Sequence, residues 1–439
     1  MKPRVGVGIL NYNRASLTIK CLDHLHRLDW PADRLEIVVV DNNSSDDSVT
    51  RLKLTHPDIR LVTSTTNRGF AGGCNLAIKS MTDVDYVALL NNDAMVEPGW
   101  LEPLVEALES SPWVGAACSK ILFATKYVDL ELESPSFRPI GTDTRDLGVR
   151  VSGLKIGQDD RFHKCHFASG FWGQEPGGNR EPDFRWTDGH AVLRVPYEEE
   201  DVGTICRLRV SAEDTKPLLV RMGEQQTEVE VHNMPAWIEV KLCGKPFDMI
   251  NNAGSDLVDS RNSADRGIFQ PDTGQFDEPG HVFAWCGCSV LLSPRYLEDV
   301  GLFDETFFLY YEDFDLSWRG QRRGWSYAYV PKSVVRHFHA STTGEYSDLF
   351  NFYVWRNRLL VLVKNASTAI AVKESSDFIA HVLRHVRSDL RNRRLSKTTT
   401  TLVKALISFL VHAPFAFYAR VRTGLRSRRA PLQIGSAAS

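Results

Sequence analysis

Leu89-Leu90-Asn91-Asn92-Asp93 (LLNND) is the stretch around which the chain is organised, because a buried run ends there and a polar one begins. The preceding residues 86–90 (YVALL) are apolar without a break, which is typical of a strand covered on both faces. Residues 97–100 then predict a helix start, with Pro98 near the first turn. Ligands of open α/β sheets bind beyond the carboxyl ends of the strands, where Asp93 would lie. A carboxylate there is suited to bind Mg²⁺ or Mn²⁺, although ordinary turn chemistry also places Asn and Asp after a strand.

Length and composition describe an ordinary soluble globular protein. The chain has 439 residues, enough for two or three domains, with 43% hydrophobic and 24% charged residues. A formal net charge of −3 excludes a globally basic nucleic-acid-binding protein, so we predict no nucleic-acid partner. The eight cysteines lack the short paired spacings of a zinc site or a disulfide-rich fold. No signal peptide precedes the first apolar run, and we therefore expect a cytoplasmic protein.

Strands and helices alternate along the first 110 residues. The sequence predicts a helix from about residue 16 to 28 and short buried strands at 5–10, 35–40, 59–62 and 86–90. Such alternation predicts a parallel sheet covered by helices, whose right-handed connections place the loops after the strands on one edge.

Two of these loops carry residues suited to a ligand. Asp41, at the end of the second strand, would accept hydrogen bonds from a nucleobase or ribose, or would cap the next helix; its position alone does not decide. Residues 67–75 combine glycines with a helix start, which suits contact with a phosphate or a sugar. This loop is neither the dinucleotide-binding glycine pattern nor a P-loop.

Four segments of this half carry a family resemblance: ILNYNR (9–14), VVVDNNSSDDS (38–48), NRGFAGGCN (67–75) and LLNNDA (89–94). They resemble the nucleotide-binding half of inverting family 2 glycosyltransferases, with rhamnosyltransferase-like and galactofuranosyltransferase-like members nearest. The GT-A fold of that family is a Rossmann-like sheet that binds a nucleotide-sugar and a divalent metal. The residues that the resemblance assigns to the nucleoside are Leu10, Tyr12 and Asp41, and those assigned to the ribose or diphosphate are Asn67 and Asn75.

The resemblance also assigns the metal carboxylate. Asp93 fills the last position of the family's Asp-X-Asp element and would bind Mn²⁺ or Mg²⁺. Asn91 stands where many members have Asp, which leaves one negative charge fewer at the metal. Asn91 and Asn92 are predicted to contact the nucleotide-sugar.

The pattern changes between about residues 127 and 247. Charged and apolar residues alternate there in five segments, namely 149–151, 192–195, 207–210, 227–231 and 237–242. This alternation is typical of strands with one buried face, and several of them separated by turns predict an inserted antiparallel β-sandwich. Its aromatic residues Trp172, Phe184 and Trp186 are predicted either as core or as a platform for a glycan ring.

The family resemblance resumes at residues 251–254 (NNAG) and continues into a second group of polar residues. Residues 281–292 predict a largely buried strand, with a kink or close approach at Gly287. Trp285 and Gly287 are predicted to contact the acceptor.

Glu312, Asp313 and Asp315 open a predicted helix that ends at about Gly324. One acid at a helix start is favoured by the helix dipole, but three exceed what a cap needs. The resemblance assigns the general base to Asp313, and a carboxylate suits that role because the incoming hydroxyl must lose its proton. Glu312 would orient the acceptor or Asp313.

His337 and His339 follow the next predicted strand, at 325–330. In related enzymes a histidine at this distance after the acidic pair completes the metal site. His337 aligns best as the metal ligand and His339 is the alternative; a single histidine near a strand end is otherwise usually structural.

The C-terminal tail is predicted to be helical and is locally basic. Its apolar stretch, residues 405–418, is flanked by arginines at 384–394 and at 420–429 and is shorter than the ~20 residues of a membrane-spanning helix. Two interpretations remain: an interfacial helix on anionic lipid, or a helix docked on the catalytic part with a solvated basic face.

These patterns predict an α/β protein with a GT-A sheet, an inserted β-sandwich and a helical C-terminal tail. The predicted segments are a nucleotide-binding half (1–126), the insert (127–247), a catalytic half (248–365) and the tail (366–439). The predicted function is metal-dependent inverting transfer of a sugar from dTDP-rhamnose or a UDP-sugar to a glycan or polyprenyl-linked glycan, on the inner face of the plasma membrane. The alternatives are a catalytically decayed glycan-binding protein and a sugar-nucleotidyltransferase, although the latter would need glycines after the first strand.

Overall fold

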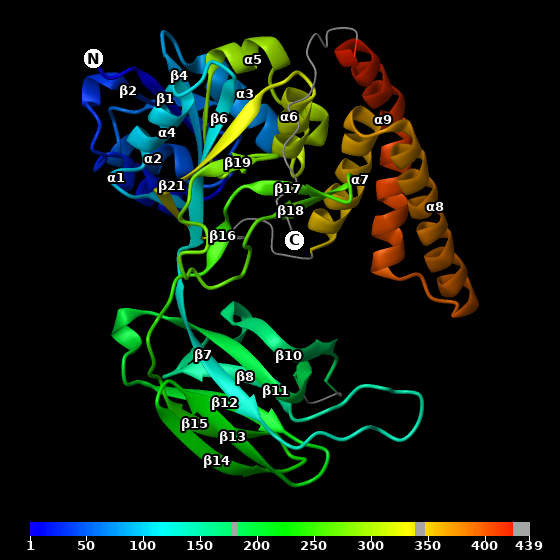
Figure 1. Ribbon diagram of the computed structural model, residues 1–439. Coiled ribbons are helices and arrows are strands. Elements are labelled where there is room, and N and C mark those ends of the chain that lie inside the picture. The colour runs from blue at the N-terminus through cyan, green and yellow to red at the C-terminus, as the bar shows by residue number, and fades with distance from the viewer. Residues whose placement is uncertain (178–181, 339–346, 425–439) are drawn as a thin grey trace. The chain divides into compact units, whose positions relative to one another are not determined.

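The computed structural model describes residues 1–177, 182–338 and 347–424 (Figure 1). These residues divide into two compact units. The first unit contains Met1–Ala124, Ile250–Ile268 and the chain from Thr273 onward. The second contains Thr125–Met249 together with Phe269–Asp272.

Within the described residues, the first unit is built on a mixed sheet of ten strands. They are β1 (Val5–Asn11), β2 (Leu35–Asp41), β3 (Arg60–Thr63), β4 (Tyr86–Asn91), β5 (Ala94–Val96), β6 (Val114–Phe123), β16 (Ile250–Asn252), β19 (Gly280–Val282), β20 (Ser289–Leu292) and β21 (Ser326–His337). The main order is β19-β21-β6-β20-β4-β1-β2-β3. Strands β1 to β4 are parallel, as predicted, whereas β20 runs antiparallel to β4 and β6.

Helices cover both faces of this sheet. They are α1 (Ala15–Leu25), α2 (Ser48–Thr55), α3 (Gly69–Ser80), α4 (Leu101–Glu109), α5 (Pro294–Val300) and α6 (Glu312–Gln321). Successive side chains of a strand point to opposite faces, so Val39 packs in the core with α1 and α4, while Val38 and Val40 pack with α3 and α5. Burial on both faces explains why these strands are apolar without alternation.

Two predicted elements have different limits in the structure. The predicted strand at 281–292 is two short strands, β19 and β20, separated by an irregular segment that contains Gly287. The helix after LLNND does not begin near Pro98: residues Ala94–Val96 first form β5, and α4 begins at Leu101. Both differences arise because short strands pair with β21 at the edge of the sheet, a tertiary interaction that local sequence does not encode.

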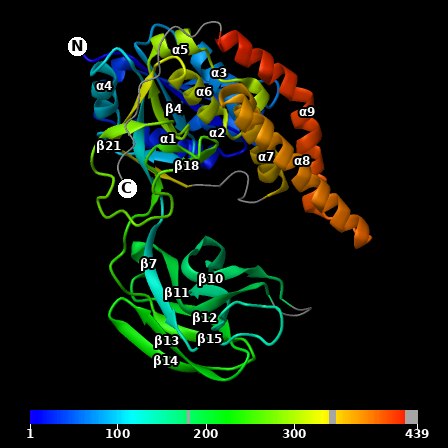
Figure 2. The same cartoon turned by 45° about the vertical axis from the view of Figure 1, so that its right-hand side comes forward.

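Three helices form the C-terminal region, which confirms the helical prediction. They are α7 (Asp348–Asn365), α8 (Thr368–Arg391) and α9 (Lys397–Gly424), which lie side by side in both views of the fold (Figures 1 and 2). Leu359, Phe378 and Phe409, one from each helix, share a core with Phe314 and Trp318 of α6. Contrary to the expectation from residues 405–418, α9 is by length and composition alone able to cross a membrane, over Lys397–Arg422.

The second unit is an antiparallel β structure, as predicted. Its nine strands among the described residues are β7 (Lys126–Glu133), β8 (Arg150–Ile156), β9 (Asp159–Asp160), β10 (His166–Glu175), β11 (Phe184–Tyr197), β12 (Ile205–Ser211), β13 (Lys216–Met222), β14 (Gln225–Val231) and β15 (Ala236–Lys241). They are hydrogen-bonded in the order β14-β13-β7-β11-β8-β12-β15, with β10 paired to β11 and β9 to β8. The inward residues of β7, β11 and β12 build its core.

The aromatic residues of the second unit do not form an open platform. Trp186 is buried, and Phe184 packs edge-on against it at a centroid distance of 5.9 Å. The Arg150 guanidinium lies over the Trp186 ring at 5.0 Å. Trp172 is half-buried and its indole N–H donates to the Asp146 carbonyl at 2.9 Å. These contacts favour the core interpretation.

Candidate active site

The turn between β4 and β5 places Asp93 beside His337. β5 pairs antiparallel with β21, in a register that sets Ala94 opposite His337. The backbone N–H of Phe338 donates to the Asp93 carbonyl at 2.9 Å. As a result, His337 Nε2 lies 3.1 Å from Asp93 Oδ1, and both side chains are buried. Residues 244 positions apart therefore meet through strand pairing.

Asn251 determines which nitrogen of His337 carries the proton. Its side-chain oxygen accepts only, and it lies 3.0 Å from Nδ1, so Nδ1 is the donor. In the neutral imidazole, Nε2 then turns a lone pair toward the Asp93 carboxylate. Two facing acceptors are stabilised only by a second proton on the imidazole or by a cation. Neighbouring ligands about 2.1 Å from an octahedral Mg²⁺ lie ~3.0 Å apart, so a divalent cation fits this pair.

The chain supplies only part of a metal coordination sphere here. Across the residues that the structure describes, no group of three His, Cys, Asp or Glu side chains gathers where a metal could bind. Asn91 is close, with its side-chain nitrogen 3.5 Å from His337 Nε2. Mg²⁺ commonly takes one or two protein carboxylates and fills its other positions with water and substrate phosphates. The Asp93–His337 pair therefore suits a metal shared with a diphosphate.

The acidic pair opens α6. The Gly287 N–H donates to Asp313 Oδ2 at 2.9 Å, and the Phe314 N–H donates to Oδ1 at 2.7 Å. Burial nevertheless raises the pKa of Asp313 to about 6, because desolvation of the carboxylate outweighs the two N–H groups, which lower it. Burial, followed by the charge of Asp313, raises the pKa of Glu312 well above its usual value. Glu312 Oε2 is buried and has no hydrogen-bond partner among the described residues.

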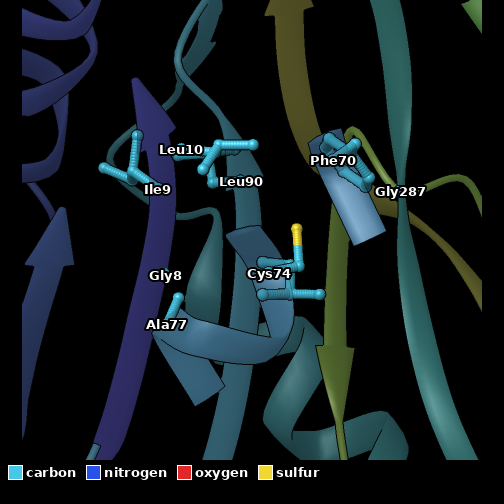
Figure 3. Close-up of a pocket in the computed structure, with 9 residues that line it drawn as sticks. Gly8, Ile9, Leu10, Phe70, Cys74, Ala77, Leu90 and Gly287 are labelled. Atoms are coloured by element: carbon cyan, nitrogen blue, oxygen red, sulfur yellow. The ribbon is translucent and has the colours of Figure 1, made fainter. Parts of the chain in front are cut away.

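A short backbone segment joins the acidic pair to the Asp93 turn. The Gly287 N–H holds Asp313, and the next residue, Cys288, accepts at its carbonyl from the Asn91 N–H at 2.9 Å. Asp93 lies two residues beyond Asn91. Figure 3 shows the small apolar pocket beside this segment, where Phe70 of α3 lies next to Gly287 and Leu90 of β4 lies next to Leu10. The structure therefore brings Asp93, His337 and Asp313 to one end of the sheet.

Asp41 organises the loop that follows β2. Its carboxylate accepts from Asn11 Nδ2 at 2.8 Å, from the Ser44 N–H at 3.0 Å and from the Ser44 hydroxyl at 2.6 Å. It does not cap α2, whose N-cap residue is Asp47. Tyr12, on the neighbouring loop, is 37% exposed. The geometry thus contradicts the capping interpretation of Asp41 and leaves Tyr12 accessible beside it.

Asn75 is in the wrong place for a ligand contact. Its side-chain nitrogen donates to the Phe303 carbonyl and to Glu305 Oε1, each at 3.0 Å, and its oxygen accepts from the Phe303 N–H at 3.1 Å. Both amide hydrogens are therefore used inside the protein, and the residue is buried. Asn75 fastens α3 to the segment before the acidic pair.

The N-terminus of α3 is likewise closed to a phosphate. The Phe308 carbonyl accepts from the Phe70 N–H at 2.6 Å and from the Ala71 N–H at 3.3 Å. Asn67 Oδ1 accepts from the Gly69 N–H at 2.9 Å and from Asn42 Nδ2 at 3.0 Å. The N–H groups that would bind an anion at this helix start already have protein acceptors, which contradicts the expected anion contact. Asn67 itself is exposed, so its side chain remains next to the nucleotide loop.

Trp285 is a core residue, contrary to the predicted acceptor contact. It is 1% exposed and packs edge-on against Phe303 at a centroid distance of 6.0 Å. Aromatic residues in an active-site strand resemble sugar-stacking residues in sequence, and only burial separates the two. Asn92 donates to the Thr18 hydroxyl at 3.0 Å and so ties the turn to α1. His339 lies outside the described residues.

The turn before α6 has an unusual backbone. Phe308, Tyr310 and Tyr311 all have positive φ, at 61°, 68° and 69°, a conformation that bulky residues rarely adopt. Asn357 of α7 holds it: its side-chain nitrogen lies 2.9, 2.8 and 2.7 Å from the carbonyls of Phe307, Leu309 and Tyr310. The sequence predicts no role for Asn357 or Asn251: Asn357 belongs to no recognisable motif, and Asn251 lies in the NNAG segment (251–254), to which no contact was assigned.

We expect Asn357→Ala to lower the free energy of unfolding by about 2–4 kcal/mol, since the carbonyls of Leu309 and Tyr310 lose a donor and a strained turn loses its support. The same relaxation should move Asp313 and reduce kcat more than it raises KM. Thermal unfolding and steady-state kinetics measure the two effects. Asn392→Ala, which replaces an exposed amide directly after α8, is the control and should change neither. Equal stability of the two variants would contradict the role of Asn357.

A comparison with models of protein families supports the class of enzyme that the site suggests. Residues 7–159, less than half of the chain, match the family model described as Glycosyl transferase family 2. The match, taken with the mixed sheet, confirms the predicted GT-A fold class and the predicted enzyme class: the protein is a glycosyltransferase. Among curated protein sequences, none matches the chain significantly.

Similar solved structures have low sequence identity. One is the mannosyltransferase PcManGT from Pyrobaculum calidifontis in complex with GDP-Man and Mn²⁺, at 15% identity over 98% of this chain and 77% of that chain, with a TM-score of 0.38. GalNAc-T7 with UDP, GalNAc and Mn²⁺ matches at 11% identity over 94% and 57%, with a TM-score of 0.45. S. aureus TarS 1–349 in complex with UDP-GlcNAc matches at 21% identity over 27% and 34%, with a TM-score of 0.25. At these TM-scores the similarities add nothing about this chain's ligands.

Proposed function

We propose that the protein transfers a sugar, with inversion, from a nucleotide diphosphate donor to a glycan or lipid-linked glycan, in a metal-dependent reaction. The observation that carries the proposal is the meeting of Asp93, His337 and Asp313 around the segment Gly287–Cys288. Each of the three is buried or half-buried, and each has a defined partner on the protein.

The donor nucleotide lies, in this proposal, at the ends of β1 and β2. Tyr12 and Leu10 contact the nucleoside, and Asp41 orders the loop that surrounds it through Ser44. Asn67 and Asn91 remain close enough to this edge to contact the ribose or the diphosphate. We propose dTDP-rhamnose or a UDP-sugar as the donor, on the resemblance to rhamnosyl- and galactofuranosyltransferases.

Asp313 is the general base. Its pKa of about 6 leaves it ionised at neutral pH, yet basic enough to take a proton from an acceptor hydroxyl. The Gly287 and Phe314 N–H groups hold the carboxylate in position. Burial raises the pKa of Glu312 well above its usual value, and we propose that Glu312 orients the acceptor or Asp313.

Asp93 and His337 hold the metal. A divalent ion bound there supplies charge stabilisation to the departing nucleotide diphosphate. Asn251 keeps the imidazole in the tautomer that presents Nε2, a supporting contact of the kind that fixes metal-ligating histidines. The requirement for the metal, and the choice between Mn²⁺ and Mg²⁺, belong to the proposal.

The acceptor is proposed to be carried on a polyprenyl lipid, with the protein on the inner face of the plasma membrane. The basic C-terminal helices support this location, since anionic lipid attracts clustered arginines.

A thermal-shift screen tests the donor. UDP-, dTDP- and GDP-sugars are tested with Mn²⁺, with Mg²⁺ and with a chelator. We expect one nucleotide to stabilise the protein by about 2.7 kcal/mol at one hundred times its Kd, and only when metal is present. Stabilisation that persists with the chelator would count against a shared metal site. No stabilisation by any nucleotide would count against sugar transfer.

A further inference from the structure

Helix α9 has two apolar faces, and the residues that the structure describes cover only one of them. Leu402, Ala405 and Phe409 are buried among α7 and α8, where they belong to the core of the C-terminal helices. The opposite side carries seven large apolar residues that are 45–68% exposed: Ile407, Leu410, Val411, Phe415, Phe417, Tyr418 and Val421. Scattered exposed apolar residues need no explanation, but seven on one helix form a patch that marks an interaction surface.

The exposed residues form a continuous stripe, which we call the α9 stripe. Ile407, Val411, Phe415, Tyr418 and Val421 recur at intervals of three and four residues, so they follow one side of the helix. From residue 407 to 421 the stripe is ~21 Å long at 1.5 Å per residue. Exposed cations flank it, Lys404 before and Arg422 after.

The positive charge around the α9 stripe indicates what kind of partner it binds. From Leu390 to Gly424 the chain contains seven Lys and Arg residues and no Asp or Glu. Arg391, Arg393, Arg394 and Lys397 are exposed at the α8–α9 connection, next to the exposed Leu390 and Leu395. A second copy would bring the same cationic segment against itself across a symmetric interface, which like charges disfavour. An anionic lipid surface complements both the apolar stripe and the cations.

We propose that α9 lies in the plane of an anionic membrane, with the α9 stripe among the lipid chains and its other face on α7 and α8. Lys404 and Arg422 reach the headgroups from the two ends of the stripe. The helix is long enough to span, but its buried face argues for the in-plane arrangement. Arg420 fastens it to the end of α7, donating to the Ala366 carbonyl at 2.6 Å and the Val363 carbonyl at 3.1 Å. A spanning helix would lose these contacts.

This inference deepens the proposed function in one respect, because it gives the membrane surface at which a lipid-linked acceptor would be met. It does not depend on the chemistry, and donor binding measured without vesicles separates the two. If the wild type does not bind vesicles through the α9 stripe but still binds the nucleotide, only the membrane inference is lost.

Co-sedimentation of the full-length protein tests the proposal, with phosphatidylcholine vesicles that contain or lack phosphatidylglycerol. The variant Leu410→Gln/Phe415→Gln/Tyr418→Gln replaces exposed residues with a good helix former, so the fold should persist, as thermal unfolding will check. Leu54→Gln/Met234→Gln/Val258→Gln is the matched control, since it replaces exposed apolar residues elsewhere. The wild type and the control should bind the anionic vesicles, and the stripe variant should bind about tenfold more weakly or less.

Three results would overturn the proposal. The first is equal vesicle binding by the wild type and the stripe variant. The second is wild-type protein that stays in cell membranes after an alkaline carbonate wash, which would show a spanning helix. The third is a wild type that ignores vesicles but is dimeric, and a stripe variant that is monomeric, which would assign the stripe to a second copy.

Discussion

Replacing Asp313 with Asn should lower kcat by about 10²–10⁴-fold, because the acceptor hydroxyl would lose its general base. Donor binding should be retained, since the neighbouring Asp93–His337 pair is untouched. Kinetics with the donor found by the thermal-shift screen measure the first effect, and calorimetric titration of the nucleotide measures the second. Asp214→Asn, an exposed carboxylate in the second unit, is the matched control and should leave both unchanged.

The pH dependence should identify Asp313 directly. The base acts when ionised, so wild-type kcat/KM should rise with pH and level off above a pKa of about 6. The residual activity of Asp313→Asn should not show this step. Asp313 would not be the base if the wild-type pH profile lacked this step, or if the step persisted in Asp313→Asn.

Stability provides an independent check on the same residue. Burial raises the pKa of Asp313 from 3.8 to about 6, so the folded protein binds this proton more tightly than the unfolded chain. The contribution of Asp313 to stability is therefore full below pH ~4 and is lost as pH rises through about 6. Asn cannot ionise, so the stability of Asp313→Asn should lack the pH dependence that the Asp313 carboxyl contributes between pH ~4 and about 6. A variant that is inactive, that unfolds cooperatively and whose stability lacks this pH dependence would exclude misfolding as the cause of inactivity.

Replacing Asp93 with Asn should cost about 10²–10³-fold in kcat/KM, with loss of the metal-dependent part of nucleotide binding. The reason is that Asp93 is the only carboxylate at the proposed metal position among the described residues, and Asn91 stands where many members of the resembled family have Asp. His337→Ala should act in the same direction. Nucleotide titrations with Mn²⁺ and with chelator measure the effect, and Asp83→Asn, an exposed aspartate, is the control.

One result with Asp93→Asn would contradict the proposed metal site. If Asp93→Asn retains wild-type affinity for the nucleotide in the presence of Mn²⁺, and that affinity still falls on chelation, the metal lies elsewhere. The protonated alternative, an imidazolium paired with Asp93, would instead predict activity that is independent of added metal.

The first half of the fold could be predicted because its signals are local. The strands near Val38 and Leu89 are apolar without a break, and each is followed by polar loop residues and a helix, so period and turn chemistry agree. The β19–β20 interruption and β5 could not be predicted in the same way. Both depend on pairing with β21, whose residues are more than forty positions away.

The site residues that could be predicted are likewise those that belong to local sequence motifs. Asp93, His337 and Asp313 belong to short motifs and lie together in the structure. Asn75 and Trp285 have residue types that suit ligands, but both are buried against Phe303. Asn75 is 228 residues from Phe303, and no local pattern reports a contact at that distance. The opposite holds for Asn251 and Asn357, for which the sequence predicted no contact. Their roles follow from folding, which sets Asn251 against His337 and Asn357 against the turn before α6.

The central claim is that Asp93 and His337 hold a metal at the end of the sheet where Asp313 acts. Anomalous scattering from crystals grown with Mn²⁺ and UDP, dTDP or GDP tests it most directly. The account predicts a Mn²⁺ peak within about 2.3 Å of both an Asp93 oxygen and His337 Nε2, with the remaining ligands from the diphosphate and water. A Mn²⁺ peak bound to the nucleotide but away from both residues would contradict it.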